Sequence, residues 1–396
     1  MYRILVVTRY YLPAYQAGGT PRSLANLVES LGDEFEFRVV TLDRGLHDQE
    51  PYPNIRVDQW QRVGKADVMY LSPRHLSVSH LRSMLRVTDY DVLYLNSCFA
   101  TTTPLTLLLR RLGLIPDKPL ILAPRGEFSR GALQIRSYKK APYLWLSRQA
   151  GLYKSITWQA TSEHELNDIL AVIGSGSPPR ISIAPNFVVD LSGQIGLSQK
   201  SAKIPSRARV VFLSRISRKK NLDYALNLLG SARGEIKFDI FGPVEDLAYW
   251  RGCQDIISRL PANIQVSYRG VLEPDQVIRS LAQYDLFLMP TRGENYGHAI
   301  IESLLAGCPV LISDQTPWQD LEERKAGWHI PLTQPERYAS VLRSVVQMTE
   351  AELLEWKQGA LEYARQVVSD PSVAQANRML FRNAIEGVRT SAVRRS

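Results

Sequence analysis

The sequence predicts an α/β protein with two doubly wound, Rossmann-like domains. Its 396 residues exceed the length at which one hydrophobic core keeps growing, so two domains are expected. With 45% hydrophobic and 22% charged residues, the composition is that of a folded protein and excludes disordered and fibrous chains. Short β-branched runs alternate with helical patterns in both halves, which is typical of parallel sheets with crossover helices.

The first half contains six short apolar runs that are rich in β-branched residues and are separated by helical patterns. We expect strands at residues 2–7, 37–42, 92–95, 120–123, 156–160 and 181–184. A polar stretch that is rich in Ser and Lys and lacks helical periodicity follows them. The sequence therefore predicts an N-terminal Rossmann-like domain over residues 1–190 and a linker over residues 191–207.

The alternation of strands and helices restarts after this linker. Strands are expected at 210–213, 238–241, 264–267, 286–289 and 310–312, which predicts a C-terminal Rossmann-like domain over residues 208–370. Helical patterns at 350–366 and 373–385 close the chain. We expect residues 371–396 to form a C-terminal helix that packs back on the N-terminal domain, followed by a basic tail.

Cysteine usage and hydropathy indicate a cytoplasmic protein. Only Cys98, Cys253 and Cys308 occur, an odd number without a Cys-x-x-Cys spacing, which argues against a disulfide framework and a structural zinc site. No apolar run approaches the roughly 20 residues that span a bilayer. Arg3 and Arg9 bracket the one candidate for a secretory leader. We therefore expect a soluble, cytoplasmic chain.

The net charge is +9, and much of the excess lies in one stretch, residues 125–159. Three interpretations of this stretch are open: a solvated helix face with core aromatics, a surface for anionic lipid at the inner face of the plasma membrane, or a nucleic-acid-binding surface. The stretch contains the basic residues Arg125, Arg130, Arg136, Lys139, Lys140, Arg148 and Lys154, one acid, Glu127, and the aromatic residues Phe128, Tyr138, Tyr143, Trp145, Tyr153 and Trp158.

Three motifs follow expected strands, where open α/β sheets bind their ligands. Gly18 and Gly19 end the long loop after the first strand and precede a helix, so their amides could approach a phosphate closely. A simple turn would use the same glycines. In the second domain, Arg215 and Lys220 belong to a group of four cations within six residues after the first strand. Such a group suits a diphosphate, whereas its alternative is an exposed surface loop.

The third motif is the segment 293–302, which contains Glu294 and Glu302. Gly297 permits a turn before a helix that starts near Ala299, so Glu294 is expected in the loop and Glu302 inside the helix. One carboxylate could then face a polar group at the helix mouth while the other accepts hydrogen bonds from vicinal hydroxyls, such as those of a ribose. Paired acids also serve as helix-dipole partners, but Glu302 stands in an apolar stretch, where an unpaired carboxylate is costly.

These motifs together resemble the retaining family 4 glycosyltransferases, which have the GT-B fold of two Rossmann-like domains facing each other across a cleft. The resemblance rests on the order of Gly18-Gly19, Arg215-x4-Lys220, Glu294-x7-Glu302 and Thr316-Pro317-Trp318 along the chain. The segments 124–133 and 160–165 also resemble a bacterial branch that builds surface polysaccharide and lipopolysaccharide.

The resemblance implies a role for each motif. Glu302 would hold the nucleotide ribose, Glu294 and the amides of Asn295, Tyr296 and Gly297 would hold donor-sugar hydroxyls, and Arg215 and Lys220 would neutralise the diphosphate. Gly18 and Gly19 would lie near that diphosphate from the other domain. His298 could touch phosphate or sugar, although helix capping and packing would also explain it.

The acceptor side is implied for the N-terminal domain, at Arg125, Gly126 and Glu127. Related enzymes often have a His there and this chain has none, so Glu127 is the candidate for handling the acceptor proton. Asn186 follows Pro185 where the family often has Asn-Gly, but Phe187 replaces the glycine here.

The implied reaction transfers a hexose from a nucleotide-diphosphate sugar, UDP- or GDP-linked, to a lipid-linked glycan with retention of anomeric configuration. Cations in a closed site would stabilise the departing diphosphate, so no metal or other cofactor is expected. The one Asp-x-Asp, Asp89-Tyr90-Asp91, precedes a strand and falls at the wrong end of the sheet for such a site. A nucleotide-sugar epimerase, a glucan synthase of the same fold and a non-catalytic nucleic-acid-binding protein are the alternatives.

Overall fold

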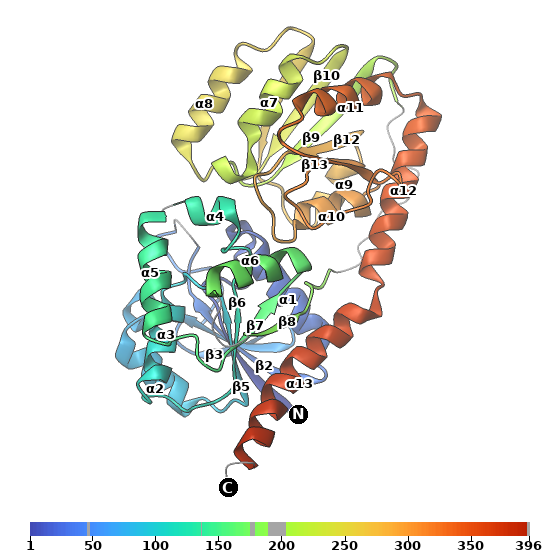
Figure 1. The fold of residues 1–396 in the computed structure, drawn as a ribbon. Coiled ribbons are helices and arrows are strands. Elements are labelled where there is room, and N and C mark those ends of the chain that lie inside the picture. Colours follow the sequence, from blue (N-terminus) through green and yellow to red (C-terminus); the bar gives the residue numbers. More distant parts are fainter. Residues whose placement is uncertain (46–47, 136, 175–178, 189–202, 394–396) are drawn as a thin grey trace. The chain divides into compact units, whose positions relative to one another are not determined.

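The computed structural model describes residues 1–396 except 46–47, 136, 175–178, 189–202 and 394–396. The chain divides into two compact units (Figure 1). Unit 1 comprises Met1–Val188 and Pro371–Ser396, and unit 2 comprises Val189–Asp370. Most of the predicted linker lies outside the described residues, as do the last three residues of the basic tail.

Unit 1 is built on one eight-stranded sheet in the order β3-β4-β2-β1-β5-β6-β7-β8. All neighbouring strands pair in parallel except β3 and β4. The strands are β1 (Tyr2–Val7), β2 (Phe35–Leu42), β3 (Trp60–Val63), β4 (Ala66–Leu71), β5 (Val92–Asn96), β6 (Leu120–Ala123), β7 (Thr157–Ala160) and β8 (Arg180–Ile183). The helices are α1 (Gly19–Leu31), α2 (Val78–Val87), α3 (Thr102–Arg111), α4 (Arg130–Gln134), α5 (Ser137–Gln149), α6 (Glu163–Ile173) and α13 (Pro371–Val393), with short 3-10 turns η1 (Tyr15–Ala17) and η2 (Pro73–His75).

Each of the six strands expected in the first half is present, but the hairpin of β3 and β4 was not predicted. β3 is an edge strand of four residues without a buried side chain, so it lacks the apolar signal of a central strand. The two strands are joined by Gly64 and Lys65, and Gly64 has a φ of 56°, in the left-handed region that glycine favours. That glycine between two short runs is the signal that could have found the hairpin.

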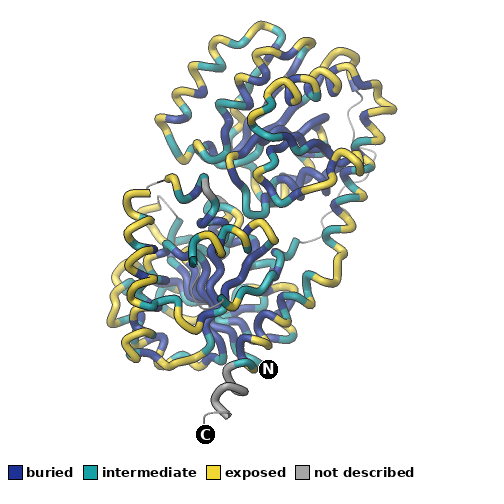
Figure 2. The backbone as a smooth tube through the Cα atoms, viewed as in Figure 1, coloured by how far each residue is buried: buried dark blue, intermediate teal, exposed yellow. Residues whose placement is uncertain are grey.

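The sheet of unit 1 separates two hydrophobic cores, because successive side chains of a strand point to opposite faces. Ile4 and Val6 of β1 face the core that contains α1 and α13, whereas Leu5 and Val7 face the core that contains α2, α3, α5 and α6. Figure 2 shows the resulting pattern, with buried strands in the middle and exposed outer helix faces.

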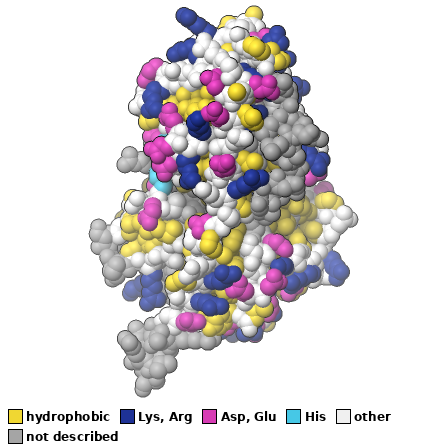
Figure 3. All heavy atoms as spheres, turned by 90° about the vertical axis from the view of Figure 1, so that its right-hand side faces the viewer, with side chains coloured by type: hydrophobic (Ala, Val, Ile, Leu, Met, Phe, Trp, Pro, Cys, Tyr) yellow, Lys and Arg dark blue, Asp and Glu magenta, His cyan; other side chains and the backbone are white. Residues whose placement is uncertain are grey.

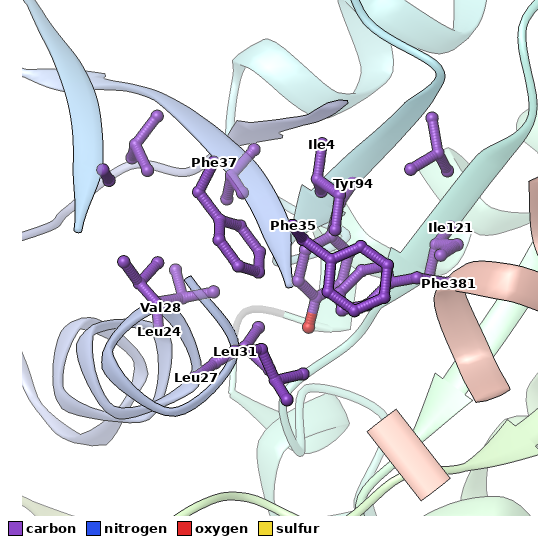
Figure 4. Close-up of a cluster of buried hydrophobic side chains, with 14 of the residues drawn as sticks. Ile4, Leu24, Leu27, Val28, Leu31, Phe35, Phe37, Tyr94, Ile121 and Phe381 are labelled. Carbon is purple, nitrogen blue, oxygen red and sulfur yellow. The ribbon is translucent and has the colours of Figure 1, made fainter. Parts of the chain in front are cut away.

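The C-terminal helix α13 contributes Phe381 to the first core (Figure 4). The ring of Phe381 lies 5.5 Å from that of Phe35, 6.1 Å from that of Phe37 and 5.5 Å from that of Tyr94, measured between centroids. The helix also contacts α1, β5 and β8. The last helix of the chain is therefore a structural part of the N-terminal sheet's core.

Unit 2 is built on a six-stranded parallel sheet in the order β11-β10-β9-β12-β13-β14, which is the 3-2-1-4-5-6 order of a Rossmann fold. Its strands are β9 (Arg207–Leu213), β10 (Glu235–Phe241), β11 (Ile264–Gly270), β12 (Leu286–Met289), β13 (Val310–Ser313) and β14 (Gly327–Ile330). Its helices are η5 (Arg218–Lys220), α7 (Leu222–Gly230), α8 (Leu247–Ile257), α9 (Val277–Leu281), α10 (His298–Leu305), α11 (Pro335–Gln347) and α12 (Glu350–Val368).

The five strands expected in the second half are present, and the edge strand β14 is an addition. It has only four residues and begins with Gly327, whose φ of 153° brings its α-carbon against the backbone of Val310. A glycine at the start of a short run weakens the strand signal in the sequence, although here it is what permits the close pairing with β13. The predicted fold class, two doubly wound Rossmann-like domains, is otherwise confirmed.

We predict that Phe381→Ala destabilises unit 1 by about 3–5 kcal/mol, because it leaves a cavity among three aromatic rings. Phe381 is fully buried. Urea unfolding followed by circular dichroism would measure the loss. Met379→Ala on the same helix is the control, since Met379 is exposed and its truncation should change stability by less than about 0.5 kcal/mol. Equal effects of the two substitutions would contradict the assignment of α13 to the core.

Candidate functional site

The first candidate site lies in unit 2, at the carboxyl ends of β9 and β12. The strand order reverses between these two strands, which are neighbours although other strands separate them in sequence. Crossover helices then leave the two strand ends in opposite directions, which opens a crevice for ligands at this point of the sheet. The predicted cations follow β9, and the predicted acidic segment follows β12.

Lys220 and Glu294 form an ion pair at this point, between Lys220 Nζ and Glu294 Oε2. Their side chains are only 12% and 14% exposed, so the pair is far less screened by water than a surface ion pair. The backbone N–H of Glu294 donates to the carbonyl of Gln315 at 2.8 Å, which holds the loop beside the segment that follows β13. The structure thus brings together two predicted site residues that are 74 positions apart in sequence.

Burial by itself would raise the pKa of the Glu294 carboxyl, but nearby positive charge outweighs it. Lys220 contributes most, followed by Lys219 and, at longer range, Arg215, so that the pKa lies below its usual value. Glu294 is therefore a carboxylate at neutral pH, and it remains available as a hydrogen-bond acceptor.

Arg215 does not join this ion pair directly. Its NH1 lies 3.0 Å from Oε1 of Glu245, and both side chains are about one third exposed. Sequence analysis missed Glu245, which follows β10, the next strand end along the sheet. Its position after a strand is the sequence feature that could have indicated Glu245 as a site residue.

Asn221 ties the two loops of this site together. Its backbone is left-handed, with φ at 62°, and its side-chain amide donates to the carbonyl of Pro290 at 2.9 Å. Nε of Arg292 donates to the Asn221 side-chain oxygen at 2.9 Å, and the N–H of Arg292 donates to the carbonyl of Lys219 at 2.8 Å. The loops after β9 and β12 are thus fixed to each other by residues that sequence analysis did not single out.

Gly297 starts helix α10 with a left-handed backbone, φ 81°, as the motif required. A Cβ at this position would lie 2.7 Å from Cδ1 of Ile300 and 3.0 Å from Cγ of Glu294, so a larger residue would displace the Ile300 side chain and strain the backbone. The ring of Tyr296 contacts those of His298 and Trp318, at centroid distances of 5.2 and 5.3 Å. Nε1 of Trp318 donates to the Tyr296 carbonyl at 2.5 Å, which anchors this loop.

The remaining donor-side residues lie along the same segment. Asn295 is in the loop before Gly297, and Glu302 is inside α10 with only 9% of its surface exposed. The expected split between a loop carboxylate at Glu294 and a helical one at Glu302 is what the structure shows. Their roles in binding stay predictions.

The second candidate site lies in unit 1, at the carboxyl ends of β1, β5 and β6. Gly18 precedes α1 with a φ of 102°, and Gly19 is the first residue of that helix. The strand order reverses here between β1 and β5. Two residues after neighbouring strands, Ser97 and Arg125, are left-handed, with φ at 76° and 58°. Such strained positions cluster at functional sites, where the surrounding contacts hold them.

Arg125 is held by three hydrogen bonds, two to side-chain oxygen atoms of strand β5 and one to an oxygen of the segment that follows β8. Its Nε donates to Oδ1 of Asn96 at 2.9 Å, its NH1 to Oδ1 of Asn186 at 2.6 Å and its NH2 to the hydroxyl of Tyr94 at 2.6 Å. The Tyr94 hydroxyl in turn donates to Oε1 of Gln159. Tyr94 and Asn96 were not predicted, although Asn96 ends a strand just where polar site residues are expected.

Glu127 has both carboxylate oxygens engaged within unit 1. Oε1 accepts from the Ser97 hydroxyl at 2.6 Å, and Oε2 accepts from the N–H groups of Cys98 and Phe99 at 2.6 and 3.2 Å. Burial raises the pKa of Glu127, against these hydrogen bonds and the charge of Lys140, which lower it. In this arrangement the side chain fixes the loop after β5, and its handling of an acceptor proton stays a prediction.

Gly126 is held by Glu165. The sequence indicated Glu165 only as a member of the segment 160–165 and not as a site residue. The Gly126 N–H donates to Oε1 of Glu165 at 2.6 Å, while Oε2 accepts from the N–H and hydroxyl of Thr161, both at 2.8 Å. The three predicted acceptor-side residues are therefore fixed by contacts from β5 and the loop after it, from Asn186 and from α6.

The structure holds no group of His, Cys, Asp or Glu side chains suited to a metal ion among its described residues. Asp89 and Asp91, the one Asp-x-Asp, both pair with Arg3 before strand β5. These two carboxylates are thus part of ion pairs with Arg3, and a reaction without a metal ion stays a prediction.

Comparison with known proteins adds to this geometry. Residues 196–361, most of unit 2, match the family model described as Glycosyl transferases group 1. Over 236 residues the chain is 24% identical to an uncharacterized 41.2 kDa protein in the cps region of Klebsiella pneumoniae. That match covers 58% of this chain, and it spans only 62% of the length of the relative.

Several solved structures are similar over nearly the whole chain. Sucrose-phosphate synthase from Thermosynechococcus elongatus superposes with a TM-score of 0.74 at 14% identity, covering 98% of this chain and all of that one. Anabaena HepE, solved in complex with UDP and glucose, has a TM-score of 0.71 at 14% identity over 97% of this chain and 99% of its own. WaaG, a glycosyltransferase involved in lipopolysaccharide biosynthesis, has a TM-score of 0.68 at 13% identity over 97% and 100%.

These likenesses establish that the chain has the GT-B fold, with two parallel sheets in a mixed α/β architecture. With the family model over unit 2, they support a GT-B glycosyltransferase. Membership of family 4 and retention of anomeric configuration stay predictions.

The Lys220–Glu294 pair makes stability depend on pH in a defined direction. Because the pKa of Glu294 is lowered by folding, its stabilising effect should be complete above the unfolded-state pKa of about 4.3 and should disappear as the pH falls through the folded-state value. We predict a coupling energy of about 1–3 kcal/mol at pH 7 in a double-mutant cycle of Lys220→Met and Glu294→Gln, and a smaller one below pH of about 4.

Urea unfolding of the wild type, both single variants and the double variant at pH 7, 5 and 3.5 would measure this coupling. The values at pH 7 and 5 should agree. A coupling that is the same at pH 3.5, or that grows there, would contradict the lowered pKa.

Proposed function

We propose that this protein is a retaining family 4 glycosyltransferase that moves a hexose from a nucleotide-diphosphate donor to a glycan acceptor. One observation supports this most: the partly buried Lys220–Glu294 pair and Arg215 lie where the strand order of the Rossmann sheet in unit 2 reverses. A cation held beside a carboxylate at such a crevice suits a ligand that joins a diphosphate to a polyhydroxylated sugar. The bound UDP and glucose of the HepE structure agree with this ligand class.

In this proposal Lys220 and Arg215 bind the diphosphate, and Glu302 accepts hydrogen bonds from the ribose. Glu294, released from part of its contact with Lys220, accepts hydrogen bonds from sugar hydroxyls together with the amides of 295–297. The Gly18–Gly19 turn before α1 of unit 1 is proposed to supply backbone amides for a phosphate group. His298 is assigned to the donor site because its ring packs on Tyr296 at the start of α10.

The chemistry follows from charge. Cleavage of the bond between the anomeric carbon and the phosphate oxygen leaves negative charge on the diphosphate, and Lys220 and Arg215 are placed to stabilise it as it develops. The acceptor hydroxyl attacks on the side of the leaving group, and the departing phosphate takes its proton, so the configuration is retained. Because two cations supply the positive charge, we propose that the reaction needs no metal ion and no other cofactor.

We further propose that the acceptor is a lipid-linked glycan of a cell-surface polysaccharide or lipopolysaccharide. The relative in the cps region and the fold likeness to WaaG favour this acceptor class. Each helix in the described part of the chain is too short or too polar to span a bilayer. We therefore propose peripheral binding at the inner face of the plasma membrane.

The surface proposed for lipid is formed by α5. Tyr138, Trp145 and Leu146 of this helix are 71%, 60% and 57% exposed, and Lys139 is exposed beside Tyr138. Aromatic and basic side chains on one helix suit the headgroup layer of an anionic membrane. On the face shown in Figure 3, by contrast, basic and acidic side chains are interspersed.

Other parts of the basic and aromatic stretch belong to the protein interior. Phe128 and Trp158 are buried, and the hydroxyls of Tyr143 and Tyr153 contact Cys98. Lys140 donates to the carbonyl of Ala132 at 2.6 Å. Arg136 lies outside the described residues. The core interpretation thus holds for four of the six aromatic residues, and the other two, Tyr138 and Trp145, are exposed on α5.

We predict that Lys220→Ala and Glu302→Ala fold but lose donor turnover. Removing a charged hydrogen-bonding partner should weaken UDP binding by about tenfold to a hundredfold, and kcat should fall by about 10²–10³. A panel of UDP- and GDP-sugars, tested by calorimetric binding and by product analysis with and without acceptor, measures both effects. Turnover that needs no acceptor would indicate an epimerase.

The control for this prediction is Lys237→Ala, an exposed lysine of β10 in the same unit. It should bind UDP as the wild type does. Wild-type turnover in both the Lys220 and the Glu302 variants would overturn the assignment of the donor site.

We predict that Lys139→Gln weakens binding to vesicles containing anionic lipid by about 1 kcal/mol, since one cation near the surface is lost. Co-sedimentation with phosphatidylcholine vesicles with and without phosphatidylglycerol would measure this change. Lys237→Gln is the matched control and should bind like the wild type. Equal binding by all three proteins would leave α5 as an ordinary solvated helix.

A further inference from the structure

Arg125 of unit 1 forms no ion pair with an acidic side chain within the described part of the protein. Its three hydrogen-bond partners, Asn96, Asn186 and Tyr94, are all neutral. The side chain is partly buried, and charges in such surroundings are normally paired. Arg209 of unit 2 is an example of the usual arrangement, with its NH2 2.7 Å from Oδ1 of Asp285.

The two carboxylates nearest in the network are committed elsewhere. Glu127 accepts from Ser97 and from two backbone N–H groups, and Glu165 accepts from Gly126 and Thr161. The guanidinium of Arg125 carries five N–H groups, of which its hydrogen bonds to Asn96, Asn186 and Tyr94 use three. Arg125 therefore retains both its charge and donor capacity for a ligand.

An independent observation at the same place is the side-chain amide of Asn96. Its Nδ2 is buried and has no hydrogen-bond partner among the described residues, while the residue is only 1% exposed. Because Arg125 can only donate, Oδ1 must be the atom that faces it, and this fixes the orientation of the carboxamide. Nδ2 belongs to the same carboxamide, so an unsatisfied donor lies beside the uncompensated guanidinium.

The pose of Arg125 is set by a rigid frame that includes the C-terminal helix. Phe381 of α13 packs edge-on against the ring of Tyr94, at 5.5 Å and 81°. Nδ2 of Asn377, also on α13 and 1% exposed, donates to the carbonyl of Pro185 at 2.8 Å, directly before Asn186. The guanidinium of Arg125 is held by these contacts and by the left-handed backbone at Ser97 and Arg125, so it is preorganised for a ligand.

We propose that Arg125 and Asn96 form a binding site for an oxyanion, either a phosphate or a carboxylate group. An oxyanion supplies the missing negative charge to Arg125 and accepts a hydrogen bond from Asn96 Nδ2. If the protein is the glycosyltransferase proposed above, this site belongs to its acceptor side and selects an acceptor that carries an anionic group. This assignment to the acceptor rests on the proposed function. Anion binding itself does not depend on that function.

Thermal unfolding with inorganic phosphate, and separately with acetate, tests the site, at constant ionic strength with chloride as the reference. Saturating UDP is present to occupy the donor site of unit 2. The wild type should be stabilised by at least one of the two anions. A response to phosphate alone assigns a phosphate-bearing acceptor, and a response to acetate alone assigns a carboxylate-bearing one.

Asn96→Asp is the decisive variant. It places a carboxylate beside Arg125, so the chain should fold with undiminished stability while anion binding weakens at least tenfold. Arg125→Gln should also lose anion binding, and the matched control Arg74→Gln, at an exposed arginine of the same unit, should retain it. A wild type without any anion response, or an Asn96→Asp variant that binds like the wild type, overturns the proposal.

Failure of this proposal and failure of the proposed function give different results. Loss of UDP binding in Lys220→Ala with an intact phosphate response would separate the two sites. A protein that binds phosphate through Arg125 but never binds UDP or UDP-sugars would retain the oxyanion site and refute the glycosyltransferase.

Discussion

Both candidate sites depend on one constraint of parallel sheets: all strands of a sheet deliver their following loops to the same edge. In a doubly wound sheet the order of strands reverses once, and the crossover helices leave a crevice at that edge. In unit 2 the reversal lies between β9 and β12, and in unit 1 between β1 and β5. Residues that follow these strands therefore come together although they are far apart in the chain.

The two sites use charge differently. In unit 2 the positive charge of Lys220 is paired with the carboxylate of Glu294, so an anion proposed to bind Lys220 would have to compete with that carboxylate. In unit 1 the charge of Arg125 meets only neutral oxygen atoms among the described residues. The two cations therefore differ in their surroundings: Lys220 has an anionic partner, whereas the hydrogen-bond partners of Arg125 are neutral.

The C-terminal helix α13 contacts the residues that hold Arg125 in the N-terminal part of the chain. Phe381 contacts the ring of Tyr94, whose hydroxyl accepts from Arg125, and Asn377 holds the carbonyl of Pro185 beside Asn186. The helix α13 thus stabilises the core of unit 1 and, through the same residues, orients a guanidinium at the carboxyl edge of its sheet. Unit 1 is therefore incomplete without the last helix of the sequence.

The sequence by itself determined the class of the fold, eleven of the fourteen strands and the segments that follow them, because these depend on local periodicity and on glycines at tight turns. Only the tertiary structure decided that Lys220 pairs with Glu294 while Arg215 pairs with Glu245, and that Asn96 and Asn186 hold Arg125. The edge strand β3 escaped prediction because it buries no side chain, whereas β14 buries three of its four residues but is short and begins with a glycine, which weakens the apolar pattern. Charge compensation and hydrogen bonding act over a few ångströms between residues from different strands, and a pattern along the chain does not contain those distances.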